Sequence, residues 1–147
     1  MPFLVRQQHK MGCGIAVLAM LTGQTYEQVF EDFGSPDLTG ENGGTSDCEM
    51  RDYLKRHGLK FGGWRLKQYI GGEETTPWPP EPTGEVCLCL VHVYPWSPCS
   101  HWVVMLPDGA ILDPVNLADT PLRLTAYDAV SSVVAIVKEN PDVSESN

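Results

Sequence analysis

The chain has 147 residues, of which 42% are hydrophobic, and its formal net charge is −9. This length supports one domain with a hydrophobic core and is short for two. Ten lysines and arginines against nineteen acids argue against a nucleic-acid ligand, because nucleic-acid binders concentrate cations, and favour basic or neutral partners. The longest apolar run is too short to cross a bilayer, so we expect neither a transmembrane helix nor a membrane partner.

The first predicted element is a buried helix that begins at a cysteine. After an extended lead-in over residues 1–11, Gly12-Cys13-Gly14 runs directly into an apolar stretch that ends at Leu21. The unpaired N–H groups and the dipole at a helix N-terminus favour a thiolate, which makes Cys13 a candidate nucleophile. Glycine on both sides leaves room for a substrate backbone to approach the sulfur. The alternative is an inert cysteine in a core helix, because free cysteines are often buried.

Two glutamines precede this cysteine in the chain. A thiolate that forms an acyl intermediate needs a hydrogen-bond donor for the oxyanion. Gln7 lies six residues before Cys13, close enough for its side-chain amide to sit beside the sulfur, and Gln8 is the neighbouring alternative. We therefore expect the oxyanion donor in the segment that leads into the first helix.

Two more helices are predicted from capping boxes. Thr25 and Ser46 are each followed three residues later by Gln or Glu, the pattern that pairs both side chains with backbone N–H groups at a helix start. The helices extend over residues 25–33 and 46–57, and a glycine follows each of them, as is common at helix ends. The first third of the chain is therefore predicted to be helical.

Strands follow, separated by a long acidic loop. Residues 59–66 and 86–93 have the composition of strands. Between them, residues 71–84 carry Trp78 among prolines, and an exposed tryptophan needs a surface to pack on, so we expect this loop to border the substrate cleft. Trp96, in the loop after the second strand, is expected to line the same cleft. The alternative is that both tryptophans cover edges of the core.

A hairpin over residues 101–113 carries the two other candidate catalytic side chains. Pro107-Asp108-Gly109 suits a three-residue loop with glycine in the left-handed position. In the register that this turn sets, His101 and Asp113 are diagonal neighbours on one face of the sheet. The carboxylate could then hold the imidazole, whereas a slip by one residue would separate the two side chains.

The end of the chain completes the sheet. We expect a short strand over 122–124, a brief helix from Thr125 and a last buried strand over 133–137, and then a flexible acidic tail over 139–147. Helices followed by an antiparallel sheet predict an α+β fold in one domain, residues 1–138.

The cysteines offer a competing metal site. Cys87, Cys89, His92, Cys99 and His101 fall within fifteen residues. Strand alternation, however, places the first two on one face and His92 on the other, which does not suit zinc. An odd total of five cysteines fits core residues in a reducing cytoplasm better than disulfides. We therefore expect no metal and no cofactor.

Taken together, these motifs resemble papain-like cysteine peptidases, and among them the bacteriocin-processing peptidases that cut double-glycine leaders. The resemblance covers residues 7–137 and follows the family order: Gln7, Cys13-Gly14, Gly44-Thr45-Ser46, His101-Trp102-Val103-Val104 and Asp113-Pro114. It implies a Cys13–His101–Asp113 triad with Gln7 as oxyanion donor. Those peptidases usually stand at the head of an export transporter and none follows in this sequence, so their substrate and pathway do not carry over.

The main hypothesis from the sequence is a cytoplasmic cysteine-dependent hydrolase that cleaves a peptide or isopeptide bond in a peptide or protein substrate. The residues expected to contact the substrate are Gly12, Gly14, Trp78, Trp96 and Trp102. The same triad could instead perform acyl transfer or deamidation, because an acyl-enzyme does not dictate its acceptor. A catalytically silent papain-like binding module or inhibitor is the third hypothesis.

Overall fold

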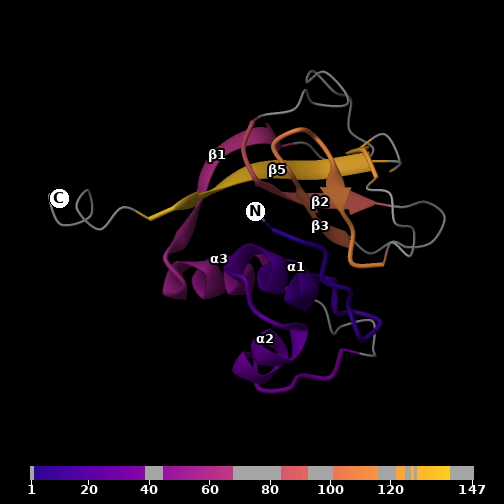
Figure 1. The fold of residues 1–147 in the computed structure, drawn as a ribbon, viewed down its shortest axis with the longest axis vertical. Helices are drawn as coiled ribbons and strands as arrows, with labels where there is room; N and C mark the ends of the chain where they lie inside the picture. Colours follow the sequence, from indigo (N-terminus) through magenta and orange to yellow (C-terminus); the bar gives the residue numbers. More distant parts are fainter. Residues whose placement is uncertain are drawn as a thin grey trace, which may run out of the picture.

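A computed structural model describes residues 2–38, 45–67, 84–92, 101–115, 122–124, 127 and 129–139. The helices lie on one side of an antiparallel sheet (Figure 1). The helices are α1 (Cys13–Thr22), α2 (Tyr26–Asp32) and α3 (Asp47–Arg56). The strands are β1 (Leu59–Lys67), β2 (Cys87–His92), β3 (His101–Met105), β4 (Ile111–Leu112) and β5 (Ala129–Lys138). The predicted α+β arrangement, with N-terminal helices packed on a C-terminal sheet, is confirmed.

Both predicted capping boxes are confirmed. The Thr25 side chain accepts a hydrogen bond from the Gln28 backbone N–H, and the Gln28 side chain accepts one from the Thr25 N–H, at 3.1 and 2.9 Å. Ser46 and Glu49 make the same reciprocal pair at the start of α3. Each box satisfies two backbone donors that a helix start leaves without a partner, so these two helices begin where the sequence indicates.

The predicted hairpin and its register are also confirmed. The Leu106 N–H donates to the Ala110 carbonyl at 2.8 Å, and Val104 pairs with Leu112 in β3 and β4. Gly109 has a φ of 93°, the left-handed conformation that the turn requires of a glycine. Extending the same register places Val103 opposite Asp113, as expected.

The sheet has the strand order β1-β5-β2-β3-β4. The long strand β5 pairs with both β1 and β2, so it lies inside the sheet. It begins at Ala129, whereas the sequence predicted a strand beginning at residue 133. Pairing of Ala129 with His92 extends the strand toward the N-terminus of the chain. Thr125, the expected start of a brief helix, lies outside the described residues, as do residues 71–83 of the acidic loop and 140–147 of the tail.

Alternating strand residues build two cores, one on each face of the sheet. On the helix side, the apolar residues of α1 pack with Leu88, Trp102 and Val104, because α1 is apolar all round. On the other side, Cys89, Val103 and their neighbours form a second buried cluster with Tyr127. His101 shares the parity of Val103, so strand alternation places its side chain on the same face of β3 as the second cluster.

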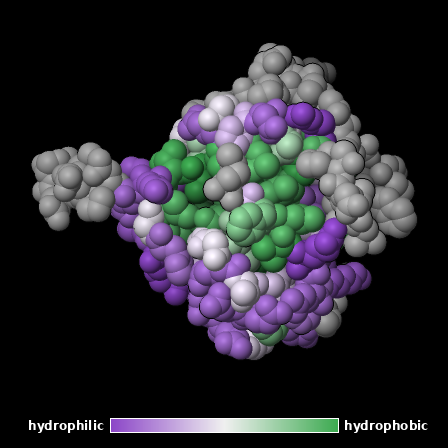
Figure 2. Space-filling view, in the orientation of Figure 1, coloured by the Kyte–Doolittle hydropathy of each residue, from purple (hydrophilic) through white to green (hydrophobic). Residues whose placement is uncertain are grey.

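The N-terminal segment runs along the helix-side face of the sheet before it enters α1 (Figure 1). Leu4 and Val5 are half-buried against the helix-side core. Figure 2 shows that apolar side chains gather at the centre of the side of the molecule that faces the viewer, and the exposed large apolar residues of the described chain are Phe3 and Val115. Within the described ranges, no helix has the length and apolar character needed to cross a membrane.

Candidate active site

Cys13 is the first residue of α1, and its side chain is buried, with 7% of its surface exposed. The residue before it, Gly12, is the N-cap and has no side chain that could cap the helix. The N–H groups of the first turn are therefore not occupied by a side-chain cap, and they point toward the end of the helix where the sulfur lies. This arrangement suits a negative charge that develops beside Cys13.

The two glycines that flank Cys13 are in tight contact with neighbouring side chains. A Cβ on Gly12 would lie 2.1 Å from the hydroxyl oxygen of Tyr26, and a Cβ on Gly14 would lie 2.5 Å from the Cβ of Thr45. Both distances are shorter than van der Waals contact, so the packing around the cysteine itself requires glycine at these positions. That they also give a substrate access to the sulfur stays a prediction.

The structure places the side chains of His101 and Asp113 in direct contact. The His101 Nε2 lies 2.6 Å from the Asp113 Oδ1, and Asp113 is 4% exposed. His101 comes from the start of β3 and Asp113 directly follows β4, so the hairpin register brings the two together. A buried carboxylate at this distance can fix the orientation of the imidazole ring and stabilise its protonated form.

Asp113 accepts further hydrogen bonds that hold it in place. The Tyr127 hydroxyl donates to its Oδ2 at 2.6 Å, and the Val115 N–H donates to its Oδ1 at 2.9 Å. Burial alone would raise the pKa of Asp113, but the hydrogen bond and charge of His101, together with these two donors, lower the pKa below its usual value. Asp113 is therefore ionised at neutral pH.

The role of Tyr127 was not predicted from the sequence. This residue is separated from Asp113 by 14 residues, and no local pattern links the two. An isolated bridge between Ile111 and Leu122 places the segment before Tyr127 alongside β4, which explains how the tyrosine reaches the carboxylate. Burial, followed by the charge of Asp113, raises the pKa of Tyr127, so its hydroxyl remains a donor.

The imidazole of His101 lies between this carboxylate and the sulfur. Burial lowers the pKa of His101, but hydrogen bonds to Asp113 and Cys13 and the charges of both outweigh it and raise the pKa to about 9. Because Nε2 faces Asp113, Nδ1 is the ring nitrogen left for the sulfur. At neutral pH His101 therefore carries a proton that it can give to a leaving group.

Gln7 connects the two halves of the site. Its backbone N–H donates to the Pro114 carbonyl at 3.2 Å, directly after Asp113. Its side-chain Nε2 donates to the carbonyls of His9 and Lys10 at 3.0 and 2.9 Å, in the loop before the cysteine. Both amide hydrogens are thus engaged, and donation to an oxyanion requires one of them to be released. The oxyanion role of Gln7 stays a prediction.

The alternative donor, Gln8, lies elsewhere. Its Nε2 donates to the Glu27 carboxylate at 2.6 Å on the exposed side of α2. This hydrogen bond lowers the pKa of Glu27. Gln8 is therefore held at the surface by α2, and the structure favours Gln7 as the glutamine associated with the site.

Trp102 links the catalytic strand to the helix layer. Its side chain is buried, and its indole N–H donates to the Thr45 carbonyl at 3.1 Å. Thr45 in turn packs on Gly14, so one chain of contacts joins the neighbour of His101 to the neighbour of Cys13. Contact between Trp102 and a substrate stays a prediction. Trp78 and Trp96 lie outside the described residues.

The residues considered for zinc do not form a site in the described part of the chain. No group of three or more His, Cys, Asp or Glu side chains there could hold a metal ion. Cys87 and Cys89 are buried on the face away from the helices, and burial raises the pKa of Cys89, which keeps that thiol protonated. Cys99 lies outside the described residues.

Comparisons with known proteins agree with this description at the level of the fold. No protein-family model and no curated protein matches the sequence. The structure is similar to the crystal structure of a double glycine motif protease from an AMS/PCAT transporter in complex with the leader peptide, with a TM-score of 0.55. The two sequences are 19% identical, and the match covers 95% of this chain and 93% of that chain. The chain therefore has the papain-like fold of that protease, as its sequence motifs led us to expect.

Proposed function

We propose that the protein is a cysteine peptidase that cleaves a peptide or isopeptide bond with Cys13, His101 and Asp113. The observation that carries the proposal is the position of the His101 ring, which is hydrogen-bonded to Asp113 and close enough to Cys13 for the sulfur to help raise the pKa of the imidazole. The fold supports it, since the similar structure is a protease. That protease was crystallised with a leader peptide, and we propose a peptide or protein substrate for this chain too.

The reaction takes place in two steps. The Cys13 thiolate attacks the carbonyl carbon, and the oxyanion is held by first-turn N–H groups of α1 and by the Gln7 amide once it releases one loop carbonyl. His101 gives its proton to the leaving amine, which departs and leaves a thioester. His101 then takes a proton from water, the resulting hydroxide attacks the thioester, and the acid product leaves with Cys13 restored. Asp113 holds the ring throughout and stabilises the imidazolium.

We further propose that the protein works in a reducing compartment such as the cytoplasm. The described cysteines, at positions 13, 48, 87 and 89, are all free thiols. A catalytic thiolate also needs reducing conditions, because oxidation to a disulfide or sulfenic acid would remove the nucleophile.

The test is alkylation of native protein with a thiol-reactive peptidase probe, followed by mass spectrometry to locate the label. We expect labelling at Cys13, slower labelling in His101→Ala, and no label in Cys13→Ala at that position. Cys48, which is exposed and outside the site, serves as the internal control for general thiol reactivity. Full peptidase activity in Cys13→Ala would overturn the proposal.

Two measurements on Cys13 separate the other two hypotheses. If folded native protein leaves Cys13 unlabelled while Cys48 reacts, the protein is a binding module and not an enzyme. If a trapped acyl-enzyme at Cys13 is released faster by an added amine than by water, the activity is acyl transfer instead of hydrolysis.

A further inference from the structure

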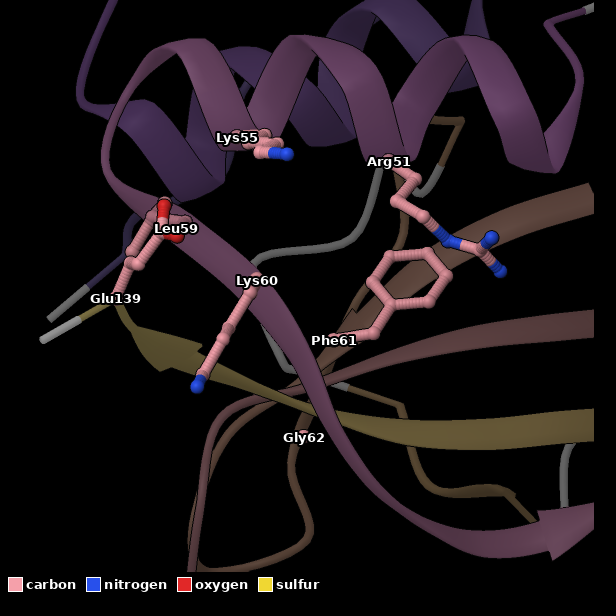
Figure 3. Close-up of a pocket in the computed structure, with 7 residues that line it drawn as sticks. All are labelled: Arg51, Lys55, Leu59, Lys60, Phe61, Gly62 and Glu139. Carbon is pink, nitrogen blue, oxygen red and sulfur yellow. The ribbon is translucent and has the colours of Figure 1, made fainter. Parts of the chain in front are cut away.

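A cavity lies at the edge of the sheet opposite to the strand that carries His101. It is formed between α3 and the first half of β1, and its volume is about 410 Å³ (Figure 3). β1 is the first strand in the sheet order, whereas the catalytic strands β3 and β4 are the last. The lining residues are Arg51, Lys55, Leu59, Lys60, Phe61, Gly62 and Glu139. We refer to these seven residues as the α3–β1 cleft.

The α3–β1 cleft is basic, although the chain as a whole is acidic. Three of the ten lysines and arginines line it, against one carboxylate, that of Glu139. Within the described part of the chain, no carboxylate lies within ion-pair distance of Arg51, Lys55 or Lys60. A cleft with a net positive lining on a protein of net charge −9 is not what an even distribution of charge would give.

Helix stability explains only part of this charge. Lys55 and Arg56 occupy the last turn of α3, where cations interact favourably with the helix dipole. Arg51 lies nearer the middle of the helix, and Lys60 belongs to β1. The guanidinium of Arg51 is held over the Phe61 ring, 5.1 Å from the ring centre, which orders the flat group at the cleft wall. The dipole of α3 therefore does not account for Arg51 in the middle of the helix or for Lys60 in β1, and both line the same cavity.

We propose that the α3–β1 cleft binds an acidic segment of a peptide. Figure 3 shows that the charged ends of Arg51, Lys55 and Lys60 are spread along the cleft and do not meet at one point. Spread cations suit carboxylates spaced along an extended chain, whereas a single phosphate needs donors that converge. Leu59 and Phe61 provide apolar surface for the side chains between the acids.

The position of the cleft also suits a peptide. β1 is an outer strand of the described sheet, and an outer strand has one edge of backbone N–H and C=O groups not used by β5. The net negative charge of the protein favours basic or neutral partners overall and repels an acidic peptide from the rest of the surface. An acidic peptide is therefore expected to bind at this cleft. The inference rests on the proposed function only in taking the peptide to be part of the substrate.

The test measures binding directly, by fluorescence anisotropy of a labelled oligoglutamate peptide, without turnover. Lys55→Glu is compared with Arg56→Glu, which makes the same charge change in the same turn of α3 but outside the cleft, where Arg56 lies over the Tyr53 ring. We expect Lys55→Glu to weaken binding by about five- to tenfold and Arg56→Glu by less than about twofold. Thermal melts verify that both variants fold. If Lys55→Glu does not fold, Lys55→Gln is used in its place.

Three results would overturn the inference. The first is that the native protein does not bind the peptide, and the second is that both charge reversals weaken binding equally. The third is that inorganic phosphate displaces the peptide far better than chloride of equal ionic strength, which would make the cleft a small-anion site. Because the assay needs no catalysis, each of these outcomes leaves the proposed peptidase activity standing. Loss of Cys13 labelling, conversely, leaves the binding measurement unaffected.

Discussion

The N-termini of α2 and α3 are closed by side chains, whereas the N-terminus of α1 is open. Thr25 and Ser46 each accept a hydrogen bond from the backbone N–H three residues later, at 3.1 and 3.2 Å. Gly12 cannot do this for α1. A glycine N-cap is only a few tenths of a kcal/mol less favourable than serine or threonine, so the open end of α1 costs little stability. An open helix end beside a cysteine is what an oxyanion site requires.

Packing replaces the missing cap at α1. Tyr26 presses on Gly12 from α2, and Thr45 presses on Gly14 from the start of α3. The Tyr26 hydroxyl is also hydrogen-bonded to the His9 ring at 2.9 Å. The open end is therefore held by its neighbours, although no side chain caps it with a hydrogen bond.

The largest expected effect concerns His101, and it is a change in the free energy of unfolding with pH. His101 has a pKa raised from 6.5 to about 9 in the folded protein, so its contribution to stability is fully present below about pH 6.5 and is lost as the pH rises through about 9. In His101→Gln this loss is absent. We expect the free energy of unfolding to fall by about 2 to 3 kcal/mol more in the native protein than in the variant between about pH 6 and pH 10.

Urea unfolding across this pH range measures the difference. The absolute stability of the variant is not the readout, since removing the imidazole also removes a partner of Asp113. Thr25→Ala, at a capped end, serves as the control, and its pH dependence should follow that of the native protein. Parallel curves for native protein and His101→Gln would contradict the raised pKa.

The next effect tests whether packing really replaces the cap. Gly12→Ala places a methyl group 2.1 Å from the Tyr26 hydroxyl oxygen, and overpacking of this kind costs about 2 kcal/mol. The backbone is not strained, because the φ of Gly12 is −92°. We expect a lower melting temperature and slower alkylation of Cys13. Adding Tyr26→Phe removes the clashing oxygen and should restore part of the melting temperature and part of the alkylation rate. A double variant whose values are no better than those of Gly12→Ala would contradict the steric cause.

The parts of the molecule that follow local rules were predicted from the sequence. The capping boxes at Thr25 and Ser46 and the hairpin turn at Gly109 each depend on residues within a few positions of one another. The contact between His101 and Asp113 follows from that turn, because register in a short hairpin is set by the loop. This is why the core of the candidate site could be located before the fold was known.

The remaining parts depend on residues distant in sequence. Nothing near Gly12 or Gly14 indicates that Tyr26 and Thr45 will press on them. The first residues of β5, Ala129 to Ser132, lack a clear strand pattern and become a strand because β2 pairs with them. Tyr127 reaches the site only because its segment is aligned beside β4. Tertiary contacts decide these features, and a single sequence does not report them.

Tyr127→Phe examines one of these distant contacts. It removes the hydroxyl that donates to the Asp113 Oδ2 and leaves a buried carboxylate with one donor fewer. We expect a loss of about 1.5 kcal/mol in stability. The lowered pKa of Asp113 contributes stability that is lost as the pH falls through that pKa, and without Tyr127 the pKa rises.

Acid unfolding is the measurement for this variant. The loss of stability should begin at a higher pH in Tyr127→Phe than in the native protein, and alkylation of Cys13 should slow because the His101 ring is held less firmly. A variant whose acid limb coincides with that of the native protein would show that the tyrosine fills space without supporting the carboxylate.

The smallest effect belongs to a closed helix end and completes the comparison. Thr25→Ala removes the cap of α2 and should lower stability by about 1 kcal/mol, or roughly 2 to 4 °C in melting temperature for a chain of this size. The alkylation rate of Cys13 should stay unchanged, because Thr25 is exposed and caps a different helix. Gly12→Ala, by contrast, lowers both stability and alkylation. If Thr25→Ala slows alkylation in proportion to its loss of stability, the reactivity of Cys13 follows general stability, and the open end of α1 has no special role.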